Sequence, residues 1–322
     1  MKDLLRLFLL VCASASAAFA QDSYRGMYRV EVDGPVRVSR RSGGESVWTY
    51  TITRRDVSGV TIVRRSVPYD VARPAAFVFE SGRLLLVHGA DGIAELYDKR
   101  GDLRTRTSLT EVPQPDPERA VLVAMHEKTA VMSISDAQGS GITLVRLDEE
   151  GTIVTRRELE GVAASGIAIA EDPELHAVSA LRWNENIVSY TTHIVRGAEV
   201  WTAPVGFKKA VFDERDRLYG MNDNEAFGLS VRGKAIVWRM QEEAGRVVLD
   251  AAITTDGVSL LSAGKPEWSE GKWIYTAPML KQVDKGGIVI SDVPLPRAKF
   301  SRGELLRVAG QVSVLLDGQP VK

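Results

Sequence analysis

Histidine and cysteine, the side chains most often used for metal binding and nucleophilic chemistry, are scarce in this chain of 322 residues. There is one cysteine, and the four histidines are His88, His126, His176 and His193. Zinc motifs place paired ligands a few residues apart, and no two of these histidines lie that close. We interpret them as ordinary strand or turn residues, and we expect no metal site.

Two oxygen-rich segments, residues 213–216 and 222–225, carry Asp, Asn and Glu side chains that calcium would accept as ligands. Neither segment has the spacing of the twelve-residue calcium loop, and Asp and Asn also favour tight turns for backbone reasons. We therefore favour turns over calcium sites. A serine hydrolase is not indicated either, because there is no Gly-x-Ser-x-Gly motif and Ser165 is interpreted as a turn residue.

The N-terminus has the pattern of an export signal. Lys2 and Arg6 precede a short apolar run, and Ala18-Phe19-Ala20 supplies the small residues of a cleavage site. We predict a signal peptide over residues 1–20, cleaved after Ala20, rather than a buried N-terminal helix. Cleavage also removes Cys12, which lacks the preceding small residue of a lipid-acceptor site. We expect a periplasmic or secreted bacterial protein with no later transmembrane segment.

Charge is distributed unevenly along the chain. The net charge is −1, which argues against nucleic acid as a partner. Residues 25–73, however, contain ten arginines and only five acidic residues. This basic segment fits an anionic partner surface, and its alternative interpretation is a solvated strand face.

Short runs of alternating apolar residues, cut by Gly, Asp and Asn, recur along the whole chain. Residues 77–109 contain four such runs joined by tight turns, and similar groups follow over residues 120–159, 166–205, 209–240 and 247–293. Residues 27–66 read as about four runs, and the tail from residue 298 as about three. In the longest group, Trp273–Val283 reads as one strand.

A glycine precedes the last strand of each group, with a mean spacing of about 43 residues, as expected for four-stranded propeller blades. These are Gly59, Gly101, Gly151, Gly197, Gly233, Gly286 and Gly318. We predict an all-β fold, a β-propeller of seven four-stranded blades, with six or eight as alternatives, forming one domain over residues 21–322. A pair of β-sandwiches and a local helix over residues 116–128 are the competing interpretations.

Two units resemble the PQQ-like repeat, in which a glycine turn opens the outer strand and a tryptophan closes it. In one unit Arg217–Asn224 leads to Val231–Trp238, and Val195–Trp201 is a shorter version. The family includes quinoprotein alcohol dehydrogenases, which hold their quinone against a disulfide of neighbouring cysteines and a calcium ion. The chain without its signal peptide has no cysteine, so the resemblance implies a binding module with no cofactor.

The longest insertion, residues 264–273, carries Trp268 among charged residues. Exposed tryptophan is enriched at binding hot spots, although Trp268 folding back onto its own blade is the alternative. We therefore predict a non-enzymatic scaffold that binds a protein partner in the cell envelope, with its oligomeric state open. The expected contact residues are Trp268, Glu267 and Trp273, and then Arg40, Arg41, Arg54 and Arg55.

The alternative function is a propeller enzyme. A hydrolase or lyase acting on a carbohydrate or a lactone would place its site at the mouth of a central channel. Carboxylates that converge in this channel, alone or with His126 at the end of a predicted inner strand, would indicate such an enzyme. No pair of carboxylates is singled out by the sequence.

Overall fold

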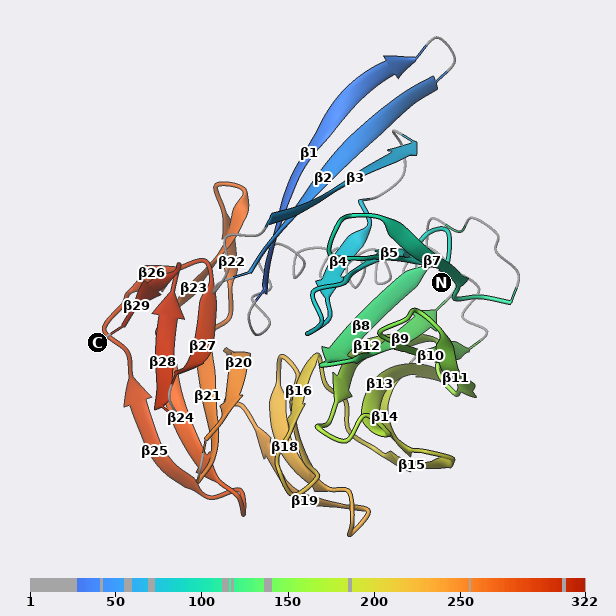
Figure 1. Ribbon diagram of the computed structural model, residues 1–322. Coiled ribbons are helices and arrows are strands. Elements are labelled where there is room, and N and C mark those ends of the chain that lie inside the picture. Colours follow the sequence, from blue (N-terminus) through green and yellow to red (C-terminus); the bar gives the residue numbers. More distant parts are fainter. Residues whose placement is uncertain are drawn as a thin grey trace. The chain divides into compact units, whose positions relative to one another are not determined.

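A computed structural model describes most of the chain beyond the predicted signal peptide. The described residues are 28–40, 43–54, 60–68, 73–111, 116, 119–135, 141–184, 187–254, 256–308 and 311–321. Every regular element among them is a β-strand (Figure 1). None of them forms a helix with the length and apolarity of a membrane crossing. Residues 1–20, including Cys12, lie outside the described residues.

The chain divides into two compact units. One unit runs to Ala164 and includes Ala180–Ser189, and the other contains Ser165–Ser179 and Tyr190 onward. The division passes through one sheet, whose strands are β12 (Ala163–Ile169), β13 (Leu175–Asn184), β14 (Ile187–Arg196) and β15 (Glu199–Ala203).

The first unit also contains one three-stranded and two four-stranded antiparallel sheets. The three-stranded sheet has β1 (Tyr28–Arg40), β2 (Gly43–Arg54) and β3 (Val60–Pro68). The next has β4 (Ala75–Val78), β5 (Leu84–His88), β6 (Ile93–Tyr97) and β7 (Leu103–Ser108). The last has β8 (Ala120–His126), β9 (Thr129–Ser135), β10 (Ile142–Asp148) and β11 (Ile153–Leu159).

The second unit continues the pattern with two four-stranded and two three-stranded sheets. The first is β16 (Lys209–Phe212), β17 (Arg217–Met221), β18 (Glu225–Ser230) and β19 (Ala235–Gln241). The second is β20 (Arg246–Ile253), β21 (Gly257–Gly264), β24 (Met279–Asp284) and β25 (Val289–Pro294). The small sheets are β22 (Glu267–Ser269), β23 (Lys272–Thr276) and β26 (Lys299–Phe300), and β27 (Gly303–Val308), β28 (Gln311–Leu316) and β29 (Gln319–Pro320).

Burial falls from the inner strands of a sheet to its last strand. Strand β5 is buried at every position, whereas β7, the last strand of the same sheet, is mostly exposed. A strand buried on both faces needs a neighbouring sheet on each side. The two apolar faces of these short sheets are therefore covered by sheet-on-sheet packing.

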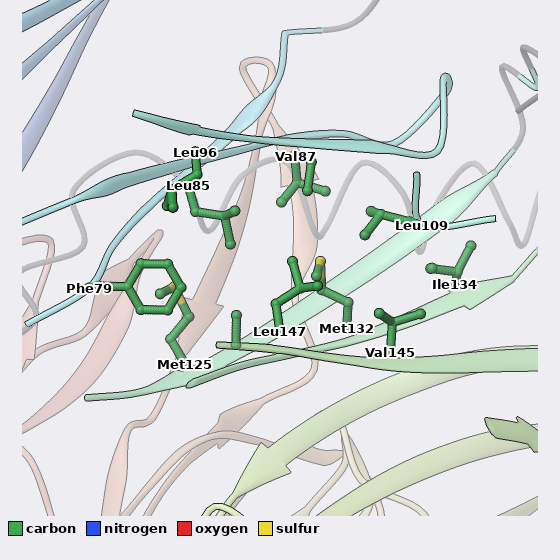
Figure 2. Packing of buried hydrophobic residues seen from close by; sticks show 12 residues of the cluster. Phe79, Leu85, Val87, Leu96, Leu109, Met125, Met132, Ile134, Val145 and Leu147 are labelled. Carbon is green, nitrogen blue, oxygen red and sulfur yellow. The ribbon is translucent and has the colours of Figure 1, made fainter. Parts of the chain in front are cut away.

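Neighbouring sheets of the first unit pack through large apolar side chains. Phe79 and Leu85 from the β4–β7 part of the chain meet Met125, Met132 and Leu147 from the β8–β11 sheet (Figure 2). Complete burial of such side chains contributes about 1.5–3 kcal/mol each. In the second unit, one core cluster likewise joins β17 and β18 to β20 and β21, and another joins β21 to β27 and β28.

The predicted glycine spacing coincides with the sheet boundaries. Gly101, Gly151, Gly197, Gly233, Gly286 and Gly318 all lie between the last two strands of their sheets. Gly59 lies outside the described residues. The glycine repeat is therefore confirmed at each of the six described positions.

Aspartate side chains shape several of the turns. The Oδ1 atoms of Asp98, Asp148, Asp213 and Asp284 each accept hydrogen bonds from the backbone N–H groups two and four residues later. The residue three positions later has a positive φ in each case, for example 78° at Gly151, which suits glycine because it lacks a Cβ. Glycine takes that position in three of the four turns and Asp216 in the fourth, so a local turn set by the aspartate ends one strand and starts the next.

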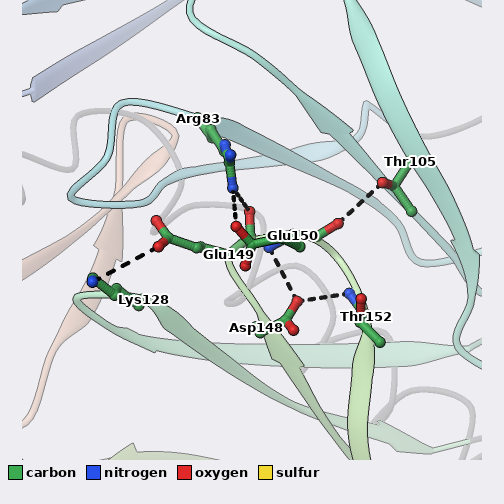
Figure 3. A network of polar contacts seen from close by, with 7 residues as sticks. All are labelled: Arg83, Thr105, Lys128, Asp148, Glu149, Glu150 and Thr152. Atoms are coloured by element: carbon green, nitrogen blue, oxygen red, sulfur yellow. Dashed lines mark hydrogen bonds and ion pairs between the residues drawn. The ribbon is translucent and has the colours of Figure 1, made fainter.

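One of these turns is also fastened to the preceding sheet. Arg83 donates to the backbone oxygen of Glu149 at 2.8 Å and to Oε1 of Glu150 at 2.7 Å (Figure 3). The hydroxyl group of Thr105 donates to the backbone oxygen of Glu150 at 3.0 Å. Polar contacts therefore fix the β10–β11 turn against the β4–β7 sheet, beside the apolar core.

Two strand predictions were wrong. Residues 27–66 form three long strands instead of about four. The pairing of β1 with β2 shifts register at a bulge around Gly34-Pro35 and then continues, so β1 is not divided there. Residues 273–283 form two strands, β23 and β24, which belong to different sheets. The break falls at Ala277, whose φ is 47°, and at Pro278, which has no N–H group to extend a ladder.

The choice of a strand over a helix after residue 119 is confirmed. Strand β8 pairs with β9 from Ala120↔Ser135 to His126↔Thr129. Apolar runs of this length are ambiguous in sequence, and the partner strand decides the outcome.

Candidate functional site

The insertion predicted to carry a binding site is a β-hairpin. Strands β22 and β23 are joined by a two-residue turn, Glu270-Gly271, whose φ values are 51° and 78°. Positive φ at both positions is the geometry of a tight hairpin turn whose twist matches the flanking strands. We call residues 267–273 the tryptophan hairpin.

The two tryptophans of the hairpin are paired directly across its strands. Trp268 lies opposite Trp273, and their rings meet edge to face with centroids 5.0 Å apart and an interplanar angle of 72°. Such aromatic pairs contribute about 0.5–1.5 kcal/mol beyond area burial. Nevertheless 61% of Trp268 and 52% of Trp273 remain exposed to solvent. Trp268 therefore packs on its hairpin neighbour while most of its surface stays open.

The base of the hairpin is anchored in the core of the second unit. Strand β23 continues from the tip and pairs with β26 through Tyr275↔Phe300. The two rings stack with centroids 5.6 Å apart, and Phe300 is buried among Leu261, Leu305 and other core residues. Figure 1 shows the hairpin as a narrow orange loop that carries the label β22. A rigid base thus displays an exposed aromatic tip flanked by the charged residues Glu267, Glu270 and Lys272.

The predicted arginine contacts are only partly described. Arg41 and Arg55 lie outside the described residues, and Arg40 is described only as the last residue of β1. Arg54 ends β2, is half-buried and is engaged with another group of the protein. The tryptophan hairpin belongs to the other unit, so the two predicted contact regions lie in different units.

Other arginines of the basic segment have structural partners. The guanidinium of Arg73 lies 5.5 Å from the ring centroid of Trp48, and Arg65 Nε lies 3.0 Å from Glu95 Oε2. These side chains contribute to packing within the first unit. The segment is therefore not simply a solvated basic face.

Glu95 is the centre of a buried polar cluster in the first unit. Its Oε2 atom accepts a hydrogen bond from the hydroxyl of Tyr97 at 2.9 Å and lies 3.1 Å from His88 Nε2. Arg65 approaches the same oxygen, and Arg106 Nε lies 3.8 Å from Oε1. Glu95 is only 2% exposed, so β3, β5, β6 and β7 enclose a carboxylate that needs these partners.

The electrostatics of this cluster favour the charged carboxylate. Burial raises the pKa of Glu95, but hydrogen bonds from His88 and Tyr97 and the charge of Arg65 outweigh it and bring the pKa down to about 2. Burial and the hydrogen bond to Glu95 raise the pKa of Tyr97. Glu95 is therefore ionised at neutral pH, and the Tyr97 hydroxyl keeps its proton as a donor.

The oxygen-rich turns use their oxygens within the fold. Asp213 accepts from the backbone N–H groups of Arg215 and Arg217, and Asn222 Oδ1 accepts from those of Asn224 and Glu225. These contacts agree with the turn interpretation. Within the described ranges, no group of three or more His, Cys, Asp or Glu residues is arranged to hold a metal ion.

The interpretation of Ser165 as a turn residue was wrong. It lies on strand β12, where its hydroxyl group is 2.7 Å from that of Ser179 and 3.0 Å from the backbone oxygen of Phe207. Serine here joins two strands and the chain segment after β15. Of the histidines, His88, His176 and His193 are buried, and His126 ends β8.

Sequence reasoning missed the Glu95 cluster. A single carboxylate inside the apolar strand Ile93–Tyr97 was the available sign, because an acidic residue is rarely buried without partners. It also missed a group of arginines on the β16–β19 sheet, namely Arg215, Arg217 and Arg232. Their proximity is not evident in the sequence because Arg232 follows the other two by some fifteen residues.

Comparison with known proteins identifies the fold and no family. No protein-family model matches the chain, and no curated protein sequence matches it. A chain from a crystal structure of the mitotic checkpoint complex is similar, with a TM-score of 0.53 and 12% identity over 86% of each chain. Virginiamycin B lyase from Staphylococcus aureus has a TM-score of 0.48 and 12% identity over 91% of this chain and 98% of that one. The chain has an all-β, β-propeller fold.

Proposed function

We propose that this chain is an exported, non-enzymatic β-propeller that binds another protein in the bacterial cell envelope, and that the tryptophan hairpin is its main contact. The observation that carries the proposal is the exposed Trp268–Trp273 pair on an anchored hairpin. The propeller fold is compatible with scaffold and enzyme functions alike, so the fold by itself does not choose between them.

The physical reason is the cost of exposing these two rings. Tryptophan has a large apolar surface, and burying it against a partner removes that surface from water. Because the two rings already pack on each other and the hairpin base is fixed, binding orders few additional groups. The flanking Glu267, Glu270 and Lys272 would then form a polar rim around the apolar contact.

Two finer points belong to the same proposal. Leaving out the small β22-β23-β26 sheet, seven sheets follow one another along the chain, which supports seven blades. We regard them as degenerate PQQ-like repeats without a redox centre. Arg40, Arg41, Arg54 and Arg55 are proposed as a second contact region for an anionic part of the partner.

Affinity capture from a periplasmic extract tests the proposal. The wild-type protein is expected to retain a specific partner, and Trp268→Ala and Trp273→Ala are each expected to weaken the recovered complex by at least tenfold, a typical hot-spot loss. Ile288→Ala is the matched control, since it also shortens an exposed apolar side chain of the same unit. Retention of the partner by both tryptophan variants at the wild-type level would contradict the assignment.

The same purification tests export. Mass spectrometry of protein recovered from the periplasm should show a chain beginning at Gln21. A full-length chain in the cytoplasmic fraction would contradict the predicted signal peptide.

A further inference from the structure

Three arginines meet at one end of the β16–β19 sheet. A hollow of about 400 Å³ is lined by Glu214, Arg215, Arg217, Ser230 and Arg232. Arg217 pairs with Ser230 across β17 and β18, so the β16–β17 turn and the β18–β19 turn lie at the same end. Strand pairing thus brings Arg232 close to residues some fifteen positions earlier in the chain.

These arginines differ from others in the same unit. Arg196, Arg239, Arg246, Arg297 and Arg302 each contact a carboxylate of the protein. Among the described side chains, no carboxylate lies within ion-pair distance of the guanidinium groups of Arg215, Arg217 or Arg232. Among the described arginine side chains of the second unit, the three without an internal counter-charge are the ones that line the hollow.

The nearby acidic residues are mostly occupied elsewhere. Asp213 accepts from two backbone N–H groups of its own turn, and Asp216 is paired with Arg196 at 2.5 Å. Glu214 is the only acidic residue among the five that line the hollow. The lining residues thus carry three guanidinium groups and one carboxylate, which gives the lining of the hollow a positive charge.

The chemistry of the lining residues defines the ligand. A guanidinium group is a planar fork of donors that matches the oxygens of phosphate and similar oxyanions. Ser230 Oγ accepts from the N–H of Gly233 at 3.1 Å, which leaves its hydroxyl hydrogen to donate. None of the lining residues is apolar, and the volume lies in the range of small-molecule sites.

We propose that this hollow binds the phosphate or sulfate group of a small polar molecule, such as a phosphorylated sugar. Arg215, Arg217 and Arg232 neutralise the anion, and Ser230 donates to one of its oxygens. The hollow lies on the β16–β19 sheet, and the tryptophan hairpin is formed by β22 and β23. The failure of one site to bind its ligand would therefore not decide whether the other site binds.

Isothermal titration of the full chain tests the site with glucose 6-phosphate, glucose 6-sulfate and glucose. We expect saturable binding of one of the two esters with a Kd below about 10 mM, and no binding of glucose. Arg215→Gln and Arg232→Gln should each weaken that binding about tenfold or more, because each removes a charge-assisted contact. Both side chains are exposed in turns, so the fold should be retained.

Controls separate a site from general charge attraction. The double variant Arg215→Gln/Arg232→Gln is compared with Lys265→Gln/Lys299→Gln, which removes the same charge from exposed positions of the same unit outside the tryptophan hairpin. Equal loss in both double variants would overturn the proposal. The proposal would also be overturned if neither ester bound saturably and vesicles of phosphatidylglycerol and phosphatidylcholine did not bind either. Binding to the vesicles alone, lost in the arginine variants, would support the site and identify a lipid phosphate as its ligand.

Discussion

Replacing Lys281 by methionine is expected to lower the free energy of unfolding by about 3–5 kcal/mol, the usual cost of breaking a buried ion pair from one side. Lys281 Nζ contacts Oε1 of Glu242, and the two side chains are only 7% and 1% exposed. Arg246 lies 3.8 Å from the same oxygen, and its Nη2 atom already donates to the backbone oxygen of Ala277. The variant would leave the buried carboxylate with this one distant cation.

The geometry around Glu242 makes the loss severe. Its Oε2 atom is buried with no hydrogen-bond partner among the described residues, and its Oε1 atom accepts from the backbone N–H of Glu243 at 3.3 Å and contacts the ammonium group of Lys281. Lys281 is thus the nearest cation to this carboxylate. The contact with Lys281 also joins the segment between β19 and β20 to strand β24. Urea-induced unfolding, followed by circular dichroism, measures the change.

A double variant distinguishes the ion pair from simple packing. Glu242→Leu/Lys281→Met removes both charges and is expected to recover most of the lost stability, because no unpaired charge remains buried. Lys265→Met, at an exposed position, is the control and should change stability by less than about 0.5 kcal/mol. A loss below about 1 kcal/mol in the single variant would contradict this account.

Acid is expected to destabilise the first unit through Glu95. The pKa of this carboxyl group falls from 4.5 to about 2 in the folded protein. A lowered folded-state pKa contributes stability that is complete above the unfolded value and is lost as the pH falls toward the folded value. The free energy of unfolding should therefore drop by about 2 kcal/mol between pH 6 and pH 3 on account of this one group.

Glu95→Gln tests the origin of this pH dependence. The variant should be less stable by about 3 kcal/mol at pH 7, because Arg65 and His88 lose their charged partner, and the difference should shrink in acid. Exposed Glu80 in the same unit provides the control Glu80→Gln. An unchanged difference between wild type and Glu95→Gln from pH 6 to pH 3 would show that the cluster does not hold the carboxylate charged.

Several elements could be predicted because their causes are local. The β10–β11 turn follows from Asp148 and Gly151, whose side-chain oxygen and positive φ act within five residues. The runs of apolar residues likewise marked β5 and β6 at nearly their final bounds. By contrast, Gly34-Pro35 has the composition of a turn and lies within a strand, because pairing with β2 resumes beyond it.

The candidate site shows the same division. Trp268 was predicted as a contact residue because it lies in an insertion rich in charged residues. Such an insertion can be recognised from residues that are neighbours in the chain. Its edge-to-face contact with Trp273, and the anchoring of the hairpin on Phe300, required the strand register. The arginine hollow was not foreseen, because Arg215 and Arg232 meet only through the pairing of β17 with β18.

Most strands and turns and the blade-like spacing could be predicted from the sequence, because alternation and turn chemistry act between residues close in the chain. Which carboxylates became buried with partners, as at Glu95 and Glu242, and which arginines were left without one depended on the tertiary structure. Those outcomes depend on contacts between strands that are distant in sequence. The free-energy cost of burying a charged side chain depends on which polar or charged groups the neighbouring strand places beside it.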